Sequence, residues 1–152
     1  MSRFKKMPFV LLIVFIAIQF IQPTLSKRSE LLAADIAQVV DVSDSVQVVL
    51  RNACYDCHSN DTNYPWYSKI QPIRWLMNKH IKQGKAELNF SEFGSYSLRR
   101  QLSKLTGIAN SVRDNSMPLS SYKWTHKIAR LTKEEKLLII DWVQQSKNIL
   151  LK

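Results

Sequence analysis

The sequence predicts an all-α domain preceded by an apolar N-terminal helix. In several segments between residues 44 and 148, apolar side chains recur at the spacing of one helix face. No segment alternates apolar and polar residues as a half-buried strand does, and only three glycines occur in 152 residues. The chain is 45% apolar and has the length of a single domain, which is enough for one hydrophobic core.

Residues 1–26 are predicted to be a targeting segment. Basic residues at Arg3, Lys5 and Lys6 precede an almost wholly apolar run over residues 7–21. No convincing small-x-small cleavage site follows, which favours an uncleaved signal anchor, although the run is short against the ~20 residues of a full span. Cleavage to a soluble form is the alternative. In both cases the positive-inside rule places the rest of the chain on the periplasmic side of a bacterial inner membrane.

Residues 27–42 are predicted to be a linker that partly packs on the domain, and residues 43–148 to be the domain itself. Its first helix begins at one of the N-cap candidates Asp41, Ser43 and Asp44. That helix is expected to run directly into the cysteine-containing segment that follows.

A second helix is expected to start near Pro72, a residue suited to a first turn, and to end with Gly84 as a C-cap. One face of it carries Ile73, Leu76, Met77 and His80. A third helix has its apolar positions at Leu98, Leu102, Leu105, Ile108 and Ala109. Residues 114–116 should end this helix, and residues 117–122 should form a loop.

The last helix is expected to begin at Thr132, which forms a capping box with Glu135 three residues later. Residues 137–143 are apolar nearly all round, which predicts deep burial. Asp141 and Gln144 are the expected exposed positions.

The most informative stretch is Cys54-Tyr55-Asp56-Cys57-His58, a C-x-x-C-H pattern typical of covalent haem attachment. Positions i, i+3 and i+4 share one helix face. Cys54 and Cys57 can therefore add to the two vinyl groups of one haem, while His58 reaches the iron from the same side as the proximal ligand. The prediction is one covalent haem c.

Other uses of a cysteine pair fit less well. A thioredoxin-like redox pair expects a βαβ context. A structural zinc site expects four nitrogen or sulfur ligands, yet the chain has two cysteines, with His80 and His126 far apart in sequence. A disulfide across so short a loop would constrain little.

Haem held through His58 leaves one axial position of the iron open. Met117 precedes a proline in an expected loop and is the favoured distal ligand, because Met/His ligation suits electron transfer. Its alternative role is to fill a gap in the core. His80 is the alternative distal ligand, although a histidine on an apolar helix face is more often a hydrogen-bonded core residue. His126, or an open site, completes the candidates.

The formal net charge of +10 indicates attraction to acidic partners. Part of the charge belongs to the N-terminal segment, and no nucleic-acid motif is present. An acidic redox protein is therefore the expected partner, and the N-terminal segment is expected to contact the membrane.

These motifs together resemble the bacterial haem-binding domain family common in Bacteroidetes. The matching stretches cover most of the chain: Gln19–Pro23, Asn52–Asn60, Tyr64–Tyr67, His80 with Gly84, Leu88–Ser91, Met117–Leu119, and Tyr122 through His126 to Leu131–Thr132. The resemblance implies a small cytochrome c-like fold with covalent haem and a distal ligand at Met117. Lys127 stands where the family usually has a proline, a departure that concerns the loop and not the attachment.

The expected function is a c-type cytochrome that transfers electrons outside the cytoplasmic membrane. A haem-based sensor with an open or labile sixth site is the alternative. An enzyme is not expected, because a small peroxidase would need a distal acid–base group and none can be assigned.

Overall fold

The computed structural model describes residues 3–22 and 34–152, and every regular element within these ranges is helical. The predicted all-α class is therefore confirmed for this part of the chain. The α-helices are α1 (Arg3–Gln19), α2 (Asp44–Ala53), α3 (Tyr55–His58), α4 (Ile73–Glu87), α5 (Leu98–Arg113), α6 (Ser120–Thr125) and α7 (Lys133–Leu150). Four 3-10 helices connect them: η1 (Ile36–Gln38), η2 (Trp66–Lys69), η3 (Phe90–Ser95) and η4 (Lys127–Ala129).

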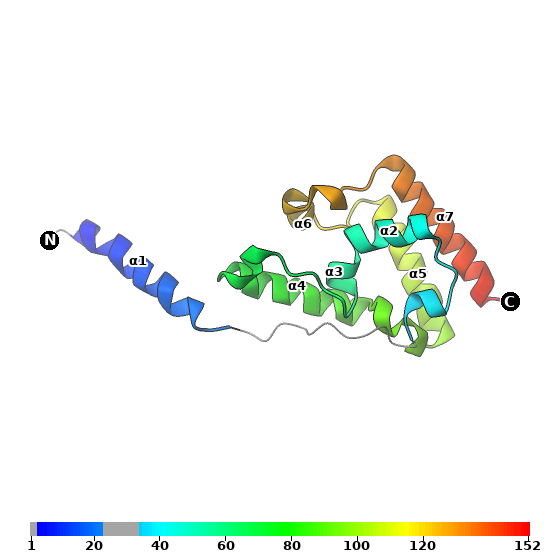
Figure 1. Cartoon of the computed structure of the whole chain (residues 1–152), viewed down its shortest axis with the longest axis horizontal. Coiled ribbons are helices and arrows are strands. Elements are labelled where there is room, and N and C mark those ends of the chain that lie inside the picture. Colours follow the sequence, from blue (N-terminus) through cyan, green and yellow to red (C-terminus); the bar gives the residue numbers. More distant parts are fainter. Residues whose placement is uncertain (1–2, 23–33) are drawn as a thin grey trace.

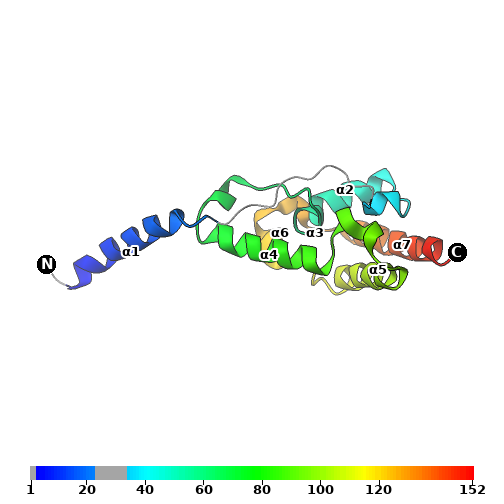
Figure 2. The same cartoon turned by 90° about the horizontal axis from the view of Figure 1, so that it is seen from below.

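The main core lies where α5 packs along α7, with α2 and η3 closing it (Figures 1 and 2). Its fully buried side chains include Leu50, Phe90, Phe93, Leu105 and Ile139. The predicted capping box starts α7, since Thr132 Oγ1 accepts from the Glu135 N–H and the Glu135 carboxylate accepts from the Thr132 N–H. This core lies beside the cysteine-containing segment, because α2 packs against both α3 and α7.

Deep burial of the whole 137–143 run was the wrong expectation for α7. Leu137 is 61% exposed, whereas Ile139, Trp142 and Val143 are buried. The helix lies on the surface of the molecule, so only one of its faces meets α5. Asp141 and Gln144 are exposed as expected.

The second half of the predicted linker carries core residues. Ile36 and Val40 are buried, and η1 packs against η3. The Trp142 indole N–H donates to the Asp41 carbonyl at 3.0 Å, which fixes this segment to α7. Residues 27–33 lie outside the described residues, as do the first two residues of the chain.

The loop expected over residues 117–122 is wrong from Ser120 onward, because α6 begins there. No residue of α6 is buried. A helix of six residues without a buried face leaves almost no apolar periodicity for a sequence pattern to detect.

Helix α1 projects from one end of the domain (Figure 1), and its C-terminal end meets the start of α4. Its 17 residues carry the apolar run, with side chains exposed over Met7–Ile16. Among the described helices, none combines the length and apolarity needed to cross a membrane.

Candidate functional site

The cysteine motif spans the junction of two short helices and does not continue a single long one as expected. Helix α2 ends at Ala53, and Cys54 leaves helical geometry with φ −126° and ψ −41°. The Cys54 carbonyl nevertheless accepts from the backbone N–H groups of Cys57 at 3.2 Å and His58 at 3.0 Å. Helical spacing from Cys54 to His58 is thereby kept while α3 turns away from α2.

His58 is oriented by two backbone carbonyls. Its Nδ1 lies 2.9 Å from the Gly84 carbonyl oxygen and 3.1 Å from that of Leu88. Both partners are acceptors only, so Nδ1 carries the proton and donates to them. The pKa of His58 is lowered, because the effect of burial outweighs the hydrogen bonds to the two carbonyls, which raise it. The neutral imidazole therefore keeps its Nε2 lone pair for a metal, the arrangement that orients a metal-binding histidine in proteins.

Gly84 allows α4 to approach the motif closely. A Cβ atom placed on Gly84 would lie 2.6 Å from the Cys57 carbonyl oxygen. Any other residue would push α3 and α4 apart and move the carbonyl that His58 uses. The expectation of a C-cap at Gly84 was wrong, because α4 continues to Glu87 and Leu88 caps it through its N–H to the Gly84 carbonyl.

Cys54 and Cys57 are free, half-buried thiols. Burial, and then the nearby Cys57, raises the pKa of Cys54 to about 12. Burial, and then the Asp56 charge, raises the pKa of Cys57 to about 11. Both groups are therefore neutral thiols near pH 7, in contrast to the low-pKa thiolates of disulfide oxidoreductases.

A cavity of about 310 Å³, here called the motif cavity, brings the predicted site residues together. It is lined by both cysteines and His58 from the motif, by His80, Gln83, Gly84 and Glu87 from α4, and by Met117, Pro118, Leu119 and Tyr122 from the chain before and within α6. The two thiols, the imidazole and the thioether thus face one space, although Met117 lies 59 positions or more from the motif in sequence.

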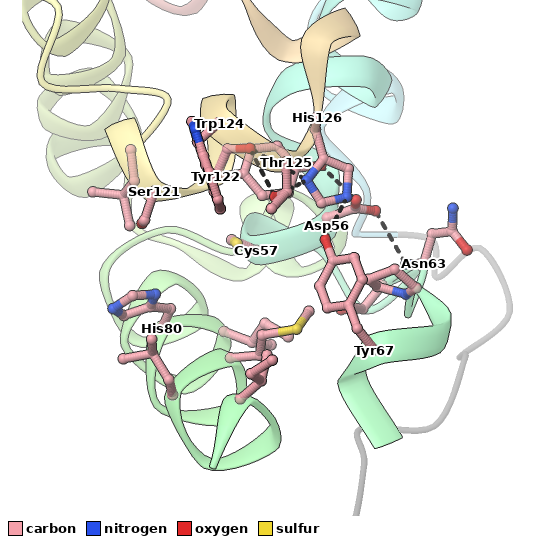
Figure 3. Close-up of a pocket in the computed structure, with 17 residues that line it drawn as sticks. Asp56, Cys57, Asn63, Tyr67, His80, Ser121, Tyr122, Trp124, Thr125 and His126 are labelled. Atoms are coloured by element: carbon pink, nitrogen blue, oxygen red, sulfur yellow. Dashed lines mark hydrogen bonds between the residues drawn. The ribbon is translucent and has the colours of Figure 1, made fainter. Parts of the chain in front are cut away.

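A second hollow of about 330 Å³, here called the apolar cavity, adjoins the first. The two share Cys57, His80, Leu119 and Tyr122. In Figure 3, Cys57 lies at the back of this hollow, between α4 with His80 and α6 with Tyr122 and Trp124. Apolar side chains from α4, chiefly Ile73, Leu76, Met77 and Ile81, form the opposite wall. Together the two hollows suit a flat apolar group that reaches from the thiols toward α6.

A polar network joins α3 to α6 at the rim of the apolar cavity (Figure 3). The Tyr122 hydroxyl donates to Asp56 Oδ2 at 2.6 Å. The imidazole of His126 stacks on the Tyr122 ring at 4.1 Å, and its Nε2 lies 3.3 Å from the Tyr67 hydroxyl. Burial, and then Asp56, raises the pKa of Tyr122. Sequence reasoning missed this network, because no short-range spacing connects Asp56 with a tyrosine 66 positions later.

The three candidates for a distal ligand occupy different places. Met117 is 37% exposed and lines the motif cavity with His58. His80 lines both hollows, whereas His126 lines the apolar cavity and is engaged with Tyr67 and Tyr122. Which of them binds iron stays a prediction.

The residues present fit a covalently attached haem. Both thiols are neutral, and the His58 Nδ1–H is hydrogen-bonded to the Gly84 carbonyl. The thiols and the imidazole line one cavity, which adjoins the apolar cavity. These are the donor types that c-type attachment uses. Within residues 3–22 and 34–152, no group of three or more His, Cys, Asp or Glu side chains is placed to hold a bare metal ion.

A family model described as a haem-binding domain matches residues 13–145. The chain belongs to the haem-binding domain family. The match spans the second half of α1, the motif, both hollows and most of α7, so this haem-binding protein uses nearly its whole length for the family's fold. Searches of curated proteins and of solved structures found no significant match.

Proposed function

We propose that this haem-binding protein is a c-type cytochrome that transfers electrons outside the cytoplasmic membrane. Cys54 and Cys57 hold one haem through thioethers, His58 is the proximal iron ligand and Met117 the distal ligand. The bound haem supplies one-electron redox chemistry, and the chain supplies burial and axial ligation.

The observation that carries this proposal is the position of His58. Its Nδ1 donates to the carbonyls of Gly84 and Leu88, and its side chain lines the same cavity as both thiols. With Nδ1 engaged by the two carbonyls, Nε2 is the ring nitrogen left to bind a metal, and the imidazole lines a cavity together with two free cysteines. The hydrogen bonds also raise the basicity of the imidazole, which strengthens it as a ligand.

The state of the thiols agrees with covalent attachment. In covalent attachment each S–H would add across a vinyl C=C bond, with a C–S bond formed and the hydrogen passed to the neighbouring carbon. This addition would need no oxidant, and the raised pKa values of Cys54 and Cys57 keep both groups as thiols near pH 7.

The lining of the motif cavity supports Met117 as the distal ligand, since its side chain comes from the chain before α6, whereas His80 comes from α4, the helix whose Gly84 carbonyl orients His58. Its 37% exposure also supports a second candidate function. A thioether on an exposed loop is easily displaced, which would make the protein a haem-based sensor with a labile sixth site.

The proposed location is the periplasmic side of the inner membrane, with α1 as an uncleaved anchor. The basic residues before the apolar run support this orientation. The net charge of +10 supports an acidic redox protein as the partner. We expect an electron carrier and not an enzyme.

Optical spectra of the purified wild type and of Met117→Ala test the proposal. The pyridine haemochrome of the wild type should show a c-type spectrum, and a b-type spectrum would overturn covalent attachment. The oxidised wild type should show the far-red band of Met-ligated haem, and Met117→Ala should lose it.

His80→Ala is the matched control, because His80 lines the same cavity from the other side. The far-red band should persist in this variant. Persistence of the band in Met117→Ala would overturn the assignment of the distal ligand. Rapid carbon monoxide binding to the reduced wild type would favour the sensor.

A further inference from the structure

The C-terminal end of α1 is tied to the domain by a set of polar contacts. The Gln71 N–H donates to Gln19 Oε1 at 2.9 Å, and Gln19 Nε2 lies 3.3 Å from the Gln71 carbonyl oxygen. The Gln71 side-chain amide donates to the Ile21 carbonyl at 2.7 Å. The Arg74 guanidinium donates to Gln22 Oε1. We call this set, residues 19–22 with Gln71 and Arg74, the clasp.

Only the two clasp residues that belong to the domain are buried, whereas residues 20–22 are exposed. Gln71 is 0% exposed and Arg74 is 9% exposed. Buried polar groups that lose their hydrogen-bond partners cost about 1–3 kcal/mol each in general. Removing the segment that contains Gln19 and Ile21 would therefore leave the Gln71 amide groups without these acceptors. Residues 19–22 behave as part of the domain, and the family match likewise begins within α1, at residue 13.

The rest of α1 has the surface of a helix that lies in lipid. Side chains from Met7 to Ile16 are 46–64% exposed, and they are apolar on every face. Such a helix has no core to bury itself against, and an all-round apolar helix is stable only inside a large core or a bilayer.

Exposed apolar side chains lie near the clasp in sequence, both at the end of α1 and in the segments before and after Gln71. Phe20 and Ile21 follow α1, Trp66 lies in η2, and Trp75 lies in the first turn of α4. Trp66 is 75% exposed and Phe20 is 84% exposed. Tryptophan is enriched where a membrane protein meets the headgroup layer. Figures 1 and 2 both show the start of α4 at the end of the domain from which α1 projects.

We propose that the clasp keeps α1 in the mature protein and seats the end of the domain formed by η2 and the start of α4 on a lipid bilayer. This inference rests on the proposed membrane anchoring by α1. The shortness of α1 supports close seating, because its part after the basic residues, Met7–Gln19, spans only about 20 Å at 1.5 Å per residue, less than the ~30 Å hydrocarbon core. Gln19 is the last residue of α1, so the clasp begins where the helix ends, and the clasp and its apolar surroundings lie at the headgroup layer. The haem-binding domain is then held in one orientation relative to the membrane.

The depth of two surface positions in vesicles tests this surface. In the haem-loaded full-length protein the native cysteines are thioethers, so a nitroxide label reacts only with an introduced thiol. Lys69→Cys places the label in η2, and Gln145→Cys places it on the exposed side of α7, away from α1. In vesicles of phosphatidylcholine and phosphatidylglycerol, the label at position 69 should show a severalfold higher ratio of oxygen to nickel-complex accessibility than the label at position 145.

Breaking the clasp from the α1 side tests its role without altering the domain. Gln19→Ala with Gln22→Ala should lower the ratio at position 69 to that at position 145, while the protein still sediments with the vesicles. Gln144→Ala, a surface glutamine of α7, is the control and should leave the ratio unchanged. An unchanged ratio in the clasp variant would overturn the clasp as the device that seats the domain.

The remaining outcomes separate this inference from the proposed function. If the full-length protein sediments with the vesicles but the label at position 69 has the accessibility of a label in water, the domain does not contact the bilayer through η2 and the start of α4. Anchoring by α1 would still hold. Failure to sediment would overturn anchoring and seating together. A mature protein that lacks residues 1–22, by intact mass, would overturn retention of α1. The haemochrome spectrum reports cofactor attachment independently of all three.

Discussion

His58 depends on a glycine that lies 26 positions away in the sequence. The Gly84 carbonyl accepts from His58 Nδ1, and the missing side chain of Gly84 lets α4 approach the Cys57 carbonyl. The positions of the imidazole and of the cysteine motif therefore depend on how closely α4 packs against α3. A substitution at Gly84 should therefore change the position of His58, the proposed proximal ligand, while the imidazole itself stays unchanged.

Gly84→Ala should destabilise the protein by about 1–3 kcal/mol, the usual cost of an overpacked core, and should lower the yield of attached haem. Gly107→Ala is the matched control, because a Cβ there meets nothing within 4 Å. It lies inside α5 and should stabilise the protein by about 0.5–1 kcal/mol through helix propensity. Denaturant unfolding of both variants checks the pair, and equal effects would contradict the close-approach argument.

The thiols give the haem-free protein a distinctive pH dependence. Burial raises the pKa of Cys54 and Cys57 from 9.0 to about 12 and about 11. The folded chain thus keeps protons that the unfolded chain releases, so their stabilising effect is complete below pH 9 and is lost progressively as the pH rises toward 11–12.

The free energy of unfolding of the haem-free protein should therefore fall between pH 9 and pH 10 more steeply than that of the Cys54→Ala, Cys57→Ala double variant. Tyr122, whose ordinary pKa is 10.0, adds its own loss mainly above this interval. The proposed covalent attachment would convert both thiols to thioethers, which do not titrate, and should remove this pH dependence from the wild type. Parallel pH profiles for the haem-free wild type and the double variant would disprove the burial of the thiols.

Among the α-helices that line the two hollows, α6 is the one least supported by apolar packing. None of its residues is buried, so the Tyr122–Asp56 hydrogen bond and the stacking of His126 on Tyr122 hold it against α3. This matters for function, because α6 forms one wall of both hollows.

Tyr122→Phe removes the hydrogen bond to Asp56 and should lower the free energy of local opening of α6 by about 1.5 kcal/mol. This is the lower end of the range for a hydrogen bond to a charged group, because Tyr122 is only half-buried. Amide exchange at Lys123 and His126, whose N–H groups bond within this turn, should accelerate about tenfold. Tyr67→Phe, which loses only a 3.3 Å contact with His126, should have a smaller effect. Unchanged exchange in Tyr122→Phe would show that other contacts hold α6.

At the scale of the whole molecule, the sequence predicted the features that have local signatures. The all-helical class follows from apolar spacing, and the Thr132 capping box follows from two residues three positions apart. The hydrogen-bond partners of His58 could not be predicted from the sequence, because they are backbone carbonyls, which every residue type carries. The break at Cys54, the continuation of α4 through Gly84 and the helix at α6 all depend on packing between distant segments, which overrides local propensity.

The denaturing intact mass of the protein matured in a bacterial periplasm tests covalent attachment most directly. The wild type should carry the added mass of one haem, because Cys54 and Cys57 line one cavity with His58. Cys54→Ser with Cys57→Ser should carry none, whereas Met117→Ala should keep the full addition. A wild-type mass equal to that of the polypeptide alone would contradict the account.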